Sequence, residues 1–252
     1  MGALRRARPR AGGGCLIEAL SAPLLVLERE GSPAALLAAA YRTGDSGRDA
    51  GTAVMCRATS SALVLGSTQR ESGFDLARCS AAGLEVVRRR SGGGAVVVRP
   101  GAQIWVDFFV PRDDPLFDDD VLASFRFVGE IWAAAIGECL PSISADRIAV
   151  ATGRPVANPW SATLCFAGLG AGEVSVDGRK VVGVSQRRDR RGAWFHSMAL
   201  LEFDPLEIAS LLAAPESRKD EAAAVLAGSA AAVPGGRASD ASLTQAVRNC
   251  IA

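Results

Sequence analysis

Lysine is nearly missing from this chain of 252 residues, because only Lys180 and Lys219 stand among its 28 basic residues. The 27 acidic residues leave a net charge of +1, so no overall field would attract nucleic acid or an anionic membrane. We therefore expect neither a nucleic-acid partner nor a membrane partner. A lysine that is kept among so many arginines is a candidate functional residue.

The cysteines lack the spacing of a metal site, since no C-x-x-C pair occurs and none lies near the only histidine, His196. We predict neither a zinc site nor a disulfide framework, and we expect reduced thiols and a cytoplasmic location. This prediction covers all six cysteines: Cys15, Cys56, Cys79, Cys139, Cys165 and Cys250.

Long apolar runs are also missing, and none reaches the length of a transmembrane helix. The basic stretch at residues 5–10 leads into a glycine-rich segment that is too polar for a secretory signal. We expect a flexible tail over residues 1–14, a catalytic domain over 15–213 and a small helical appendage over 214–252, where alanine, glycine and charged residues dominate. The 49% of apolar residues predict a packed core, and a monomer is expected.

Short apolar runs bounded by turn residues alternate with a few helical patterns, which predicts an α/β fold with a mixed β-sheet and flanking helices. The segment 16–27 reads as a short helix or apolar arm, and 43–51 as a loop. A turn at 99–102 suggests that the strands on either side form a hairpin. Helices are expected at 33–41, 75–82, 121–140, 205–213 and 241–250, and strands at 53–58, 62–65, 84–88, 95–98, 103–110, 147–151, 173–176, 180–186 and 194–203.

A run of three glycines, Gly92 to Gly94, follows three arginines and Ser91. Glycines let the backbone approach a ligand closely and expose N–H groups, and guanidinium groups add fixed positive charge. The segment is therefore a candidate site for a phosphate or a polarised carbonyl, or else a flexible loop with solvated arginines. It fits neither the P-loop pattern nor the dinucleotide fingerprint.

Lys180 follows an Asp-Gly pair, Asp177 and Gly178, which is a strong signal for a hairpin turn. A lysine held on a rigid strand can polarise a carbonyl or stabilise developing negative charge. The alternative is a solvated lysine beside a surface turn.

Together, Arg-Arg-x-Ser-Gly-Gly-Gly-Ala-Val at 89–97 and Asp-Gly-Arg-Lys-Val-Val-Gly-Val-Ser-Gln-Arg-Arg at 177–188 resemble the hallmark motifs of the biotin/lipoate protein ligase catalytic-domain family. The resemblance covers about residues 53–203. It implies a fold similar to class II aminoacyl-tRNA synthetases and biotin synthetase, in which Lys180 contacts the carbonyl end of a bound acyl group. It also implies that the acyl pocket is lined by Arg89, Ser91, Gly92, Gly93, Gly94, Ala95, Gly183 and Ser185.

Cys165 lies fifteen residues before Lys180 and resembles the nucleophile of the cysteine-dependent octanoyltransferases, the branch to which this chain looks closest. A thiolate there would take an octanoyl or lipoyl group from a donor such as octanoyl acyl carrier protein and pass it to a lysine. The resemblance implies a lipoyl-domain or glycine-cleavage-H-type protein as acceptor, and no cofactor. A buried structural thiol is the simpler alternative.

Two other functions stay open. The first is a lipoate–protein ligase that uses ATP and magnesium with free lipoate or octanoate, in which Cys165 is incidental. The second is a non-catalytic acyl-binding relative, because Val98, Arg99 and Gln103 depart from the usual residues after the glycine loop.

The only histidine, His196, lies in a strand-like run. It is expected to be a partly buried, hydrogen-bonded histidine rather than a general base.

Overall fold

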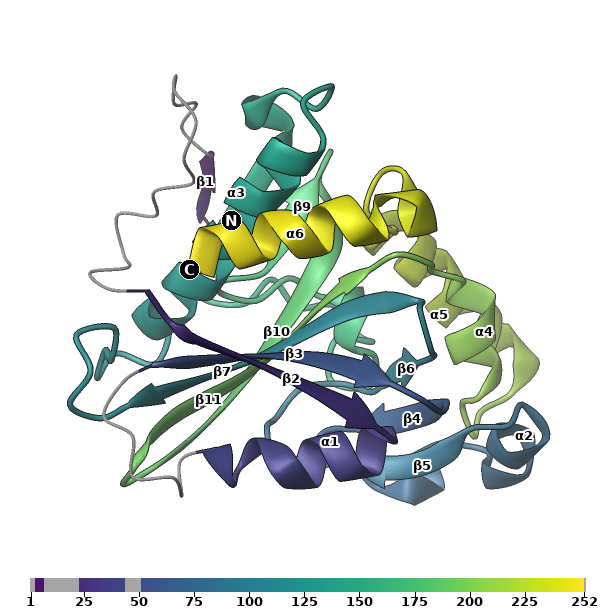
Figure 1. The fold of residues 1–252 in the computed structure, drawn as a ribbon. Helices are drawn as coiled ribbons and strands as arrows, with labels where there is room; N and C mark the ends of the chain where they lie inside the picture. Colours follow the sequence, from purple (N-terminus) through teal and green to yellow (C-terminus); the bar gives the residue numbers. More distant parts are fainter. Residues whose placement is uncertain (1–2, 7–22, 44–50, 252) are drawn as a thin grey trace.

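The computed structural model describes residues 3–6, 23–43 and 51–251. Its fold is mixed α/β, with two sheets and flanking helices (Figure 1). The strands are β1 (Ala3–Arg6), β2 (Leu25–Gly31), β3 (Thr52–Ala58), β4 (Ala62–Leu65), β5 (Glu85–Arg88), β6 (Val96–Val98), β7 (Gln103–Pro111), β8 (Ile148–Thr152), β9 (Val174–Val176), β10 (Arg179–Asp189) and β11 (Gly192–Leu200). The helices are α1 (Pro33–Ala40), α2 (Leu76–Ala81), α3 (Arg126–Cys139), α4 (Pro205–Ser210), α5 (Glu216–Ser229) and α6 (Asp240–Ile251).

The large sheet has eight strands in the order β1-β8-β9-β10-β11-β7-β3-β2, and only its β2–β3 pair is parallel. The small sheet has the order β5-β4-β6, with β4 and β5 parallel. Both sheets are therefore mixed, as the sequence predicted. The small sheet lies beside the large one at the end where α1, α4 and α5 gather (Figure 1).

Two apolar cores hold the layers together. In the first, α3 and α6 cover one face of the large sheet with side chains such as Trp132 and Leu243. In the second, α1, α4 and α5 pack against the small sheet and the other face of the large one, with Leu63, Trp105 and Leu226 fully buried. Burial of so much apolar surface is the main driving force for this arrangement.

Local signals account for several helix ends. The Ser32 hydroxyl accepts from the Ala35 amide at 3.2 Å, and Pro33 occupies the first turn of α1. The Asp75 carboxylate accepts from the Arg78 amide at 3.0 Å, which confirms the predicted start of α2. These caps explain why the sequence places both helices well.

The predicted hairpin of residues 95–98 and 103–110 is wrong. Strand β6 pairs with β4 in the small sheet, whereas β7 pairs with β3 and β11 in the large one. The turn chemistry at 99–102 therefore carries the chain from one sheet to the other. A turn signal fixes a change of direction but not the partner of the strand that follows.

Three further expectations are corrected or limited. Residues 25–27 belong to strand β2, not to a helix, and residues 23 and 24 lead into it without regular structure. Residues 16–22 of that segment and 44–50 of the predicted loop lie outside the described residues. The helix predicted from residue 121 begins at Arg126, after a 3-10 turn at Ala123–Phe125.

Cys250 is disulfide-bonded, contrary to the expectation of reduced thiols. The other cysteines that the structure describes are free: Cys56, Cys79, Cys139 and Cys165.

The division into tail, catalytic domain and appendage stays a prediction. Within the expected tail, Ala3–Arg6 pairs with β8 at the edge of the large sheet. Within the expected appendage, α5 and α6 contribute buried side chains to the two cores. Among the described residues, no helix is long and apolar enough to cross a membrane.

Candidate active site

An open groove of about 350 Å³ lies between the glycine loop, the segment that carries Cys165, and strand β10. Seven of the ten site residues predicted from the sequence line it: Arg89, Gly92, Gly93, Gly94, Cys165, Lys180 and Ser185. The other three lie directly behind its walls: Ser91, Ala95 and Gly183. Two motifs nearly ninety residues apart in the chain therefore face one space.

The glycine loop is joined to the segment before Cys165. The Cys165 amide donates to the Ala95 carbonyl at 2.9 Å, and the Ala95 amide donates to the Thr163 carbonyl at 2.8 Å. A Cβ atom on Gly94 would lie 2.5 Å from the carbonyl carbon of Leu164 and 2.6 Å from the Cys165 nitrogen. Gly94 must therefore be glycine because two backbones meet there.

Arg89 holds the shape of the glycine loop. Its guanidinium donates to the Gly92 carbonyl at 2.7 Å and to the Gly94 carbonyl at 2.8 Å, and only 4% of the residue is exposed. Burial lowers the pKa of Arg89, and among the described residues no carboxylate forms an ion pair with it. The loop is thus folded around a buried positive charge that has no ion-pair contact among the described residues, and the alternative of solvated arginines is wrong for Arg89.

Lys180 reaches the groove through an irregular hairpin. Asp177 and Gly178 take positive φ angles of 52° and 77°, which confirms the predicted turn between β9 and β10. The β9–β10 register shifts between Lys180 and Val182, and such a bulge can turn a side chain out of the usual alternation. Lys180 is only 2% exposed, so the alternative of a solvated surface lysine is wrong.

The Lys180 ammonium has a full set of partners. It donates to the Glu173 carboxylate at 2.6 Å, to the Cys165 carbonyl at 2.7 Å and to the Gly168 carbonyl at 3.2 Å. An ammonium has three N–H donors, so these contacts use all of them. Its nitrogen also lies 4.7 Å from the ring centroid of Phe166. Lys180 therefore fixes the turn that carries Cys165.

Glu173 is a site residue that the sequence analysis missed. It is 5% exposed, and besides Lys180 it accepts from the Gly170 amide at 2.6 Å and from the Val184 amide at 3.2 Å. A buried carboxylate with a cation and two N–H donors is a well-satisfied counter-ion. In the sequence it is one acid among 27, and only the fold brings it to Lys180.

Cys165 is half-buried on the 3-10 turn Cys165–Ala167 and lines the groove together with Arg89.

Two contacts of strand β10 complete the site. The hydroxyls of Ser91 and Ser185 are hydrogen-bonded at 2.8 Å, so the glycine loop and β10 are joined directly. A Cβ on Gly183 would lie 3.1 Å from the Phe166 ring, so this glycine makes room for that ring.

A narrow apolar slot of about 30 Å³ continues from the groove behind Cys165. It shares Arg89, Cys165, Val184 and Ser185 with the groove. Its deeper walls are mostly apolar: Leu37, Val64, Val96, Trp105, Phe166 and Met198. Such a volume holds a water molecule or two.

His196 closes one side of this slot and is fully hydrogen-bonded, as expected. Its Nδ1 lies 2.7 Å from Asp107 and its Nε2 lies 2.8 Å from the Tyr41 hydroxyl. Asp107 also accepts from the indole N–H of Trp105 at 2.6 Å. Burial, followed by the charge of Asp107, raises the pKa of Tyr41 to about 12, so the phenol stays protonated.

No group of three or more His, Cys, Asp or Glu side chains that could hold a metal ion occurs in the part of the chain that the structure describes.

Comparison with known proteins agrees with this geometry. The chain is 26% identical over 151 residues to the octanoyltransferase LipM of Clostridioides difficile, a match that covers 60% of this chain and only 54% of LipM. Its fold is similar to that of protein Ta0514 of T. acidophilum, solved with bound lipoic acid (TM-score 0.63, 19% identity, 89% of this chain and 81% of that one). It is also similar to a lipoate-protein ligase A bound with ATP (TM-score 0.60, 18% identity, 89% of this chain and 84% of that one).

A family model described as the lipoyl protein ligase A/B catalytic domain matches residues 33–232. This match spans most of the chain and includes the glycine loop, Cys165, Glu173 and Lys180. The relatives are transferases and ligases of lipoyl and octanoyl groups. The chain belongs to the lipoyl protein ligase A/B catalytic domain family.

Proposed function

We propose that this protein is a cysteine-dependent acyltransferase that moves an octanoyl or lipoyl group from a carrier thioester to a lysine of a lipoyl-domain protein. The observation that carries the proposal is the placement of the half-buried Cys165 thiol at the junction of the groove and the apolar slot, beside Arg89. The slot offers an apolar surface for the acyl chain, and the groove leaves the thiol open to a donor.

In the first step the Cys165 thiolate attacks the thioester carbonyl of an octanoyl carrier. The new bond joins Sγ to the acyl carbon and the bond between that carbon and the carrier sulfur breaks. The proton that the Cys165 thiol gave up on forming the thiolate is taken up by the carrier sulfur, which leaves as a thiol. In the second step the neutral amine of the acceptor lysine attacks the enzyme thioester. An amide forms, the bond to Sγ breaks, and a proton from the amine returns to Cys165.

Arg89 is the cation best suited to stabilise the thiolate, because no carboxylate among the described residues neutralises it. A buried positive charge favours a nearby anion far more than a solvated one does. Lys180 has a different role in this proposal. Since its three N–H groups hold Glu173, Cys165 and Gly168, it positions the cysteine turn. It can contact a substrate carbonyl only by giving up one of these partners.

The proposed acceptor and donor are inferred from what is known of similar proteins. One structural neighbour is a bi-partite lipoate protein ligase studied with its E2 lipoyl domain from Thermoplasma acidophilum (TM-score 0.62, 17% identity). We propose a lipoyl-domain or glycine-cleavage-H-type acceptor for this chain by the same chemistry, and octanoyl acyl carrier protein as donor. Neither half-reaction needs ATP or a metal, because the thioester already carries the acyl group in activated form.

The test is intact-protein mass spectrometry after incubation with octanoyl acyl carrier protein in the absence of ATP. Wild type is expected to gain one octanoyl mass, and Cys165→Ala is expected to gain none. Cys139→Ala is the matched control, because Cys139 is also a half-buried free cysteine but lies on α3, away from the groove. It should be labelled like wild type.

Two outcomes would overturn the mechanism. If neither wild type nor Cys139→Ala gains mass, the thioester route is wrong. If a lipoyl domain is then modified by Cys165→Ala with free lipoate, ATP and magnesium, the protein is an ATP-dependent ligase. Binding of octanoate without a covalent product under either condition would identify a non-catalytic relative.

A further inference from the structure

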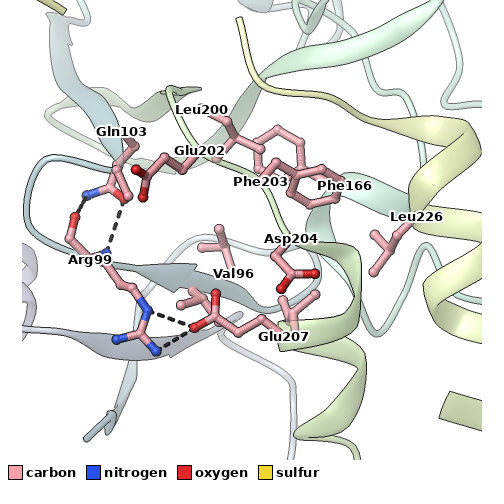
Figure 2. A pocket seen from close by; sticks show the side chains of 13 residues that line it. Val96, Arg99, Gln103, Phe166, Leu200, Glu202, Phe203, Asp204, Glu207 and Leu226 are labelled. Carbon is pink, nitrogen blue, oxygen red and sulfur yellow. Dashed lines mark hydrogen bonds and ion pairs between the residues drawn. The ribbon is translucent and has the colours of Figure 1, made fainter. Parts of the chain in front are cut away.

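A second cavity, of about 310 Å³, adjoins the slot, because Phe166 and Val96 line both. Figure 2 shows the side chains that line this cavity. Its inner end is apolar, and the rings of Phe166 and Phe203 lie there beside Leu226. Its outer end carries Glu202, Asp204 and the ion pair of Arg99 with Glu207. Neither the sequence motifs nor the proposed reaction assigns it a role.

The partition between this cavity and the slot consists of Phe166 and Val96, which line both spaces. On one side the Phe166 ring lies 4.7 Å from the Lys180 nitrogen, and on the other its centroid is 6.2 Å from that of Phe203. Phe166 stands on a short 3-10 turn next to Cys165. The slot therefore adjoins the groove on one side and the second cavity on the other, and a single ring and a valine separate it from the second cavity.

The volumes show why the partition matters. An acyl chain attached to Cys165 can lie in the open groove or enter the apolar slot, which holds only about 30 Å³. Eight carbons need far more room than a water or two. The cavity behind Phe166 has about 310 Å³, a size typical of small-molecule pockets. If the Phe166 ring turned away from this partition, the two spaces would be joined beside Val96.

We infer that the second cavity is the distal half of the acyl site, that Phe166 is the gate between the halves, and that the enzyme accepts acyl chains longer than eight carbons. This inference rests on the proposed function, because it takes Cys165 as the point of attachment. The distal half selects an uncharged chain end, since the carboxylate of Asp204 would repel an anionic one, whereas Glu202 and Glu207 are already paired with arginines.

The first experiment narrows the cavity without touching the groove or the slot. Val97 is half-buried on β6 and lines only the second cavity, so Val97→Phe fills part of it. Intact-mass labelling rates are compared for carriers loaded with 8-carbon and 12-carbon chains. Each buried methylene strengthens binding about fourfold, so the ratio of 12-carbon to 8-carbon labelling should fall roughly tenfold or more.

Val87→Phe is the matched control, because Val87 is a half-buried valine on β5 of the same small sheet and lines none of the three cavities. Its labelling ratio should equal that of wild type. Phe166→Leu acts in the opposite direction. The smaller leucine side chain leaves a wider passage between the slot and the second cavity, so the ratio of 12-carbon to 8-carbon labelling should rise. This variant keeps the test decisive even if Val97→Phe does not fold.

A binding measurement separates this inference from the proposed function. Titration calorimetry of Cys165→Ser with dodecanoate needs no thioester chemistry, and Val97→Phe on that background should weaken binding roughly tenfold. Labelling of wild type by the 8-carbon carrier together with unchanged ratios and unchanged dodecanoate affinity would overturn the distal site alone. Dodecanoate binding that depends on Val97 without any labelling would overturn the reaction and keep the site.

Discussion

The two walls of the groove hold their positive charges in different ways. On the β10 wall, Lys180 is neutralised by the buried carboxylate of Glu173 and saturated by two carbonyls. On the glycine-loop wall, Arg89 is equally buried, but its guanidinium contacts only carbonyl oxygens in the described part of the chain. The β10 wall is held by an ion pair, whereas the glycine-loop wall is held by hydrogen bonds from the Arg89 guanidinium to backbone carbonyls.

Because of this difference, we expect Lys180 to contribute mainly to the stability of the site and Arg89 mainly to the reaction. A charge that is already paired contributes little field to a substrate, whereas an uncompensated one acts on any anion that forms nearby. We therefore expect the motif lysine to anchor the cysteine turn and the arginine beside the glycines to be the stronger source of positive potential in the groove. Three changes test the comparison, from the largest expected effect to the smallest.

Breaking the ion pair should cost the most stability. Lys180→Met leaves Glu173 buried without its cation, which should lower the free energy of unfolding by about 3–5 kcal/mol. Urea denaturation measures the loss. Lys219→Met is the matched control, because the only other lysine pairs with Glu216, whose side chain is 70% exposed, and such a pair is worth about 1 kcal/mol or less.

The double variant Lys180→Met with Glu173→Gln sharpens the test. Since it removes both charges, it should recover part of the stability that Lys180→Met loses. A double variant no more stable than the single one would show that the buried pair does not hold this wall.

Beside the slot, the buried carboxylate of Asp107 is held by hydrogen bonds with Trp105 and His196 rather than by a lysine. This hydrogen-bonded group predicts that the stability of the fold depends on pH. Tyr41 beside His196 and Asp107 has its pKa raised to about 12, above the ordinary value of 10.0. Above pH 10 the unfolded chain ionises this phenol and the folded chain does not, so stability should fall between pH 10 and 12. The loss should be roughly 2 kcal/mol.

Tyr41 is the only tyrosine in the chain, so the absorbance of tyrosinate reports its titration directly. Tyr41→Phe should remove the phenol's contribution to the loss of stability between pH 10 and 12. An absorbance midpoint near 10 in the folded protein would contradict the buried network.

Crowding the glycine-loop wall should affect stability less than breaking the ion pair does, and it should clearly slow the reaction. Gly94→Ala places a Cβ 2.5 Å from the Leu164 carbonyl carbon, so the loop and the cysteine turn must separate. We expect a loss of about 1–3 kcal/mol and much slower labelling of Cys165. Gly92→Ala is the control, since a Cβ there meets nothing within 4 Å. Equal effects of the two substitutions would show that the close approach at Gly94 is unimportant.

Local chemistry made much of this fold readable from the sequence. The caps at Ser32 and Asp75 and the turn at Asp177 and Gly178 act within a few residues, so their signals survive without any tertiary context. The glycine loop was equally visible, because only glycine permits such close backbone contact.

The functional assembly was visible in part. The two motifs indicated that Lys180 and the glycine loop share a site, and the structure places them in one groove. The roles of Cys165 and Lys180 in a reaction stay predictions. Glu173 could not be found, because a carboxylate seven residues before a lysine gives no signal until the strands pair.

By itself, the sequence determined the helix caps, the turns, the glycine-rich backbone and the family motifs. Only the tertiary structure decided that β6 and β7 enter different sheets, that Glu173 neutralises Lys180 while Arg89 keeps its charge, and that Phe166 separates two cavities. The physical reason is range. Turns and caps depend on neighbouring residues, whereas strand partners, buried charge balance and cavity walls depend on packing between distant segments.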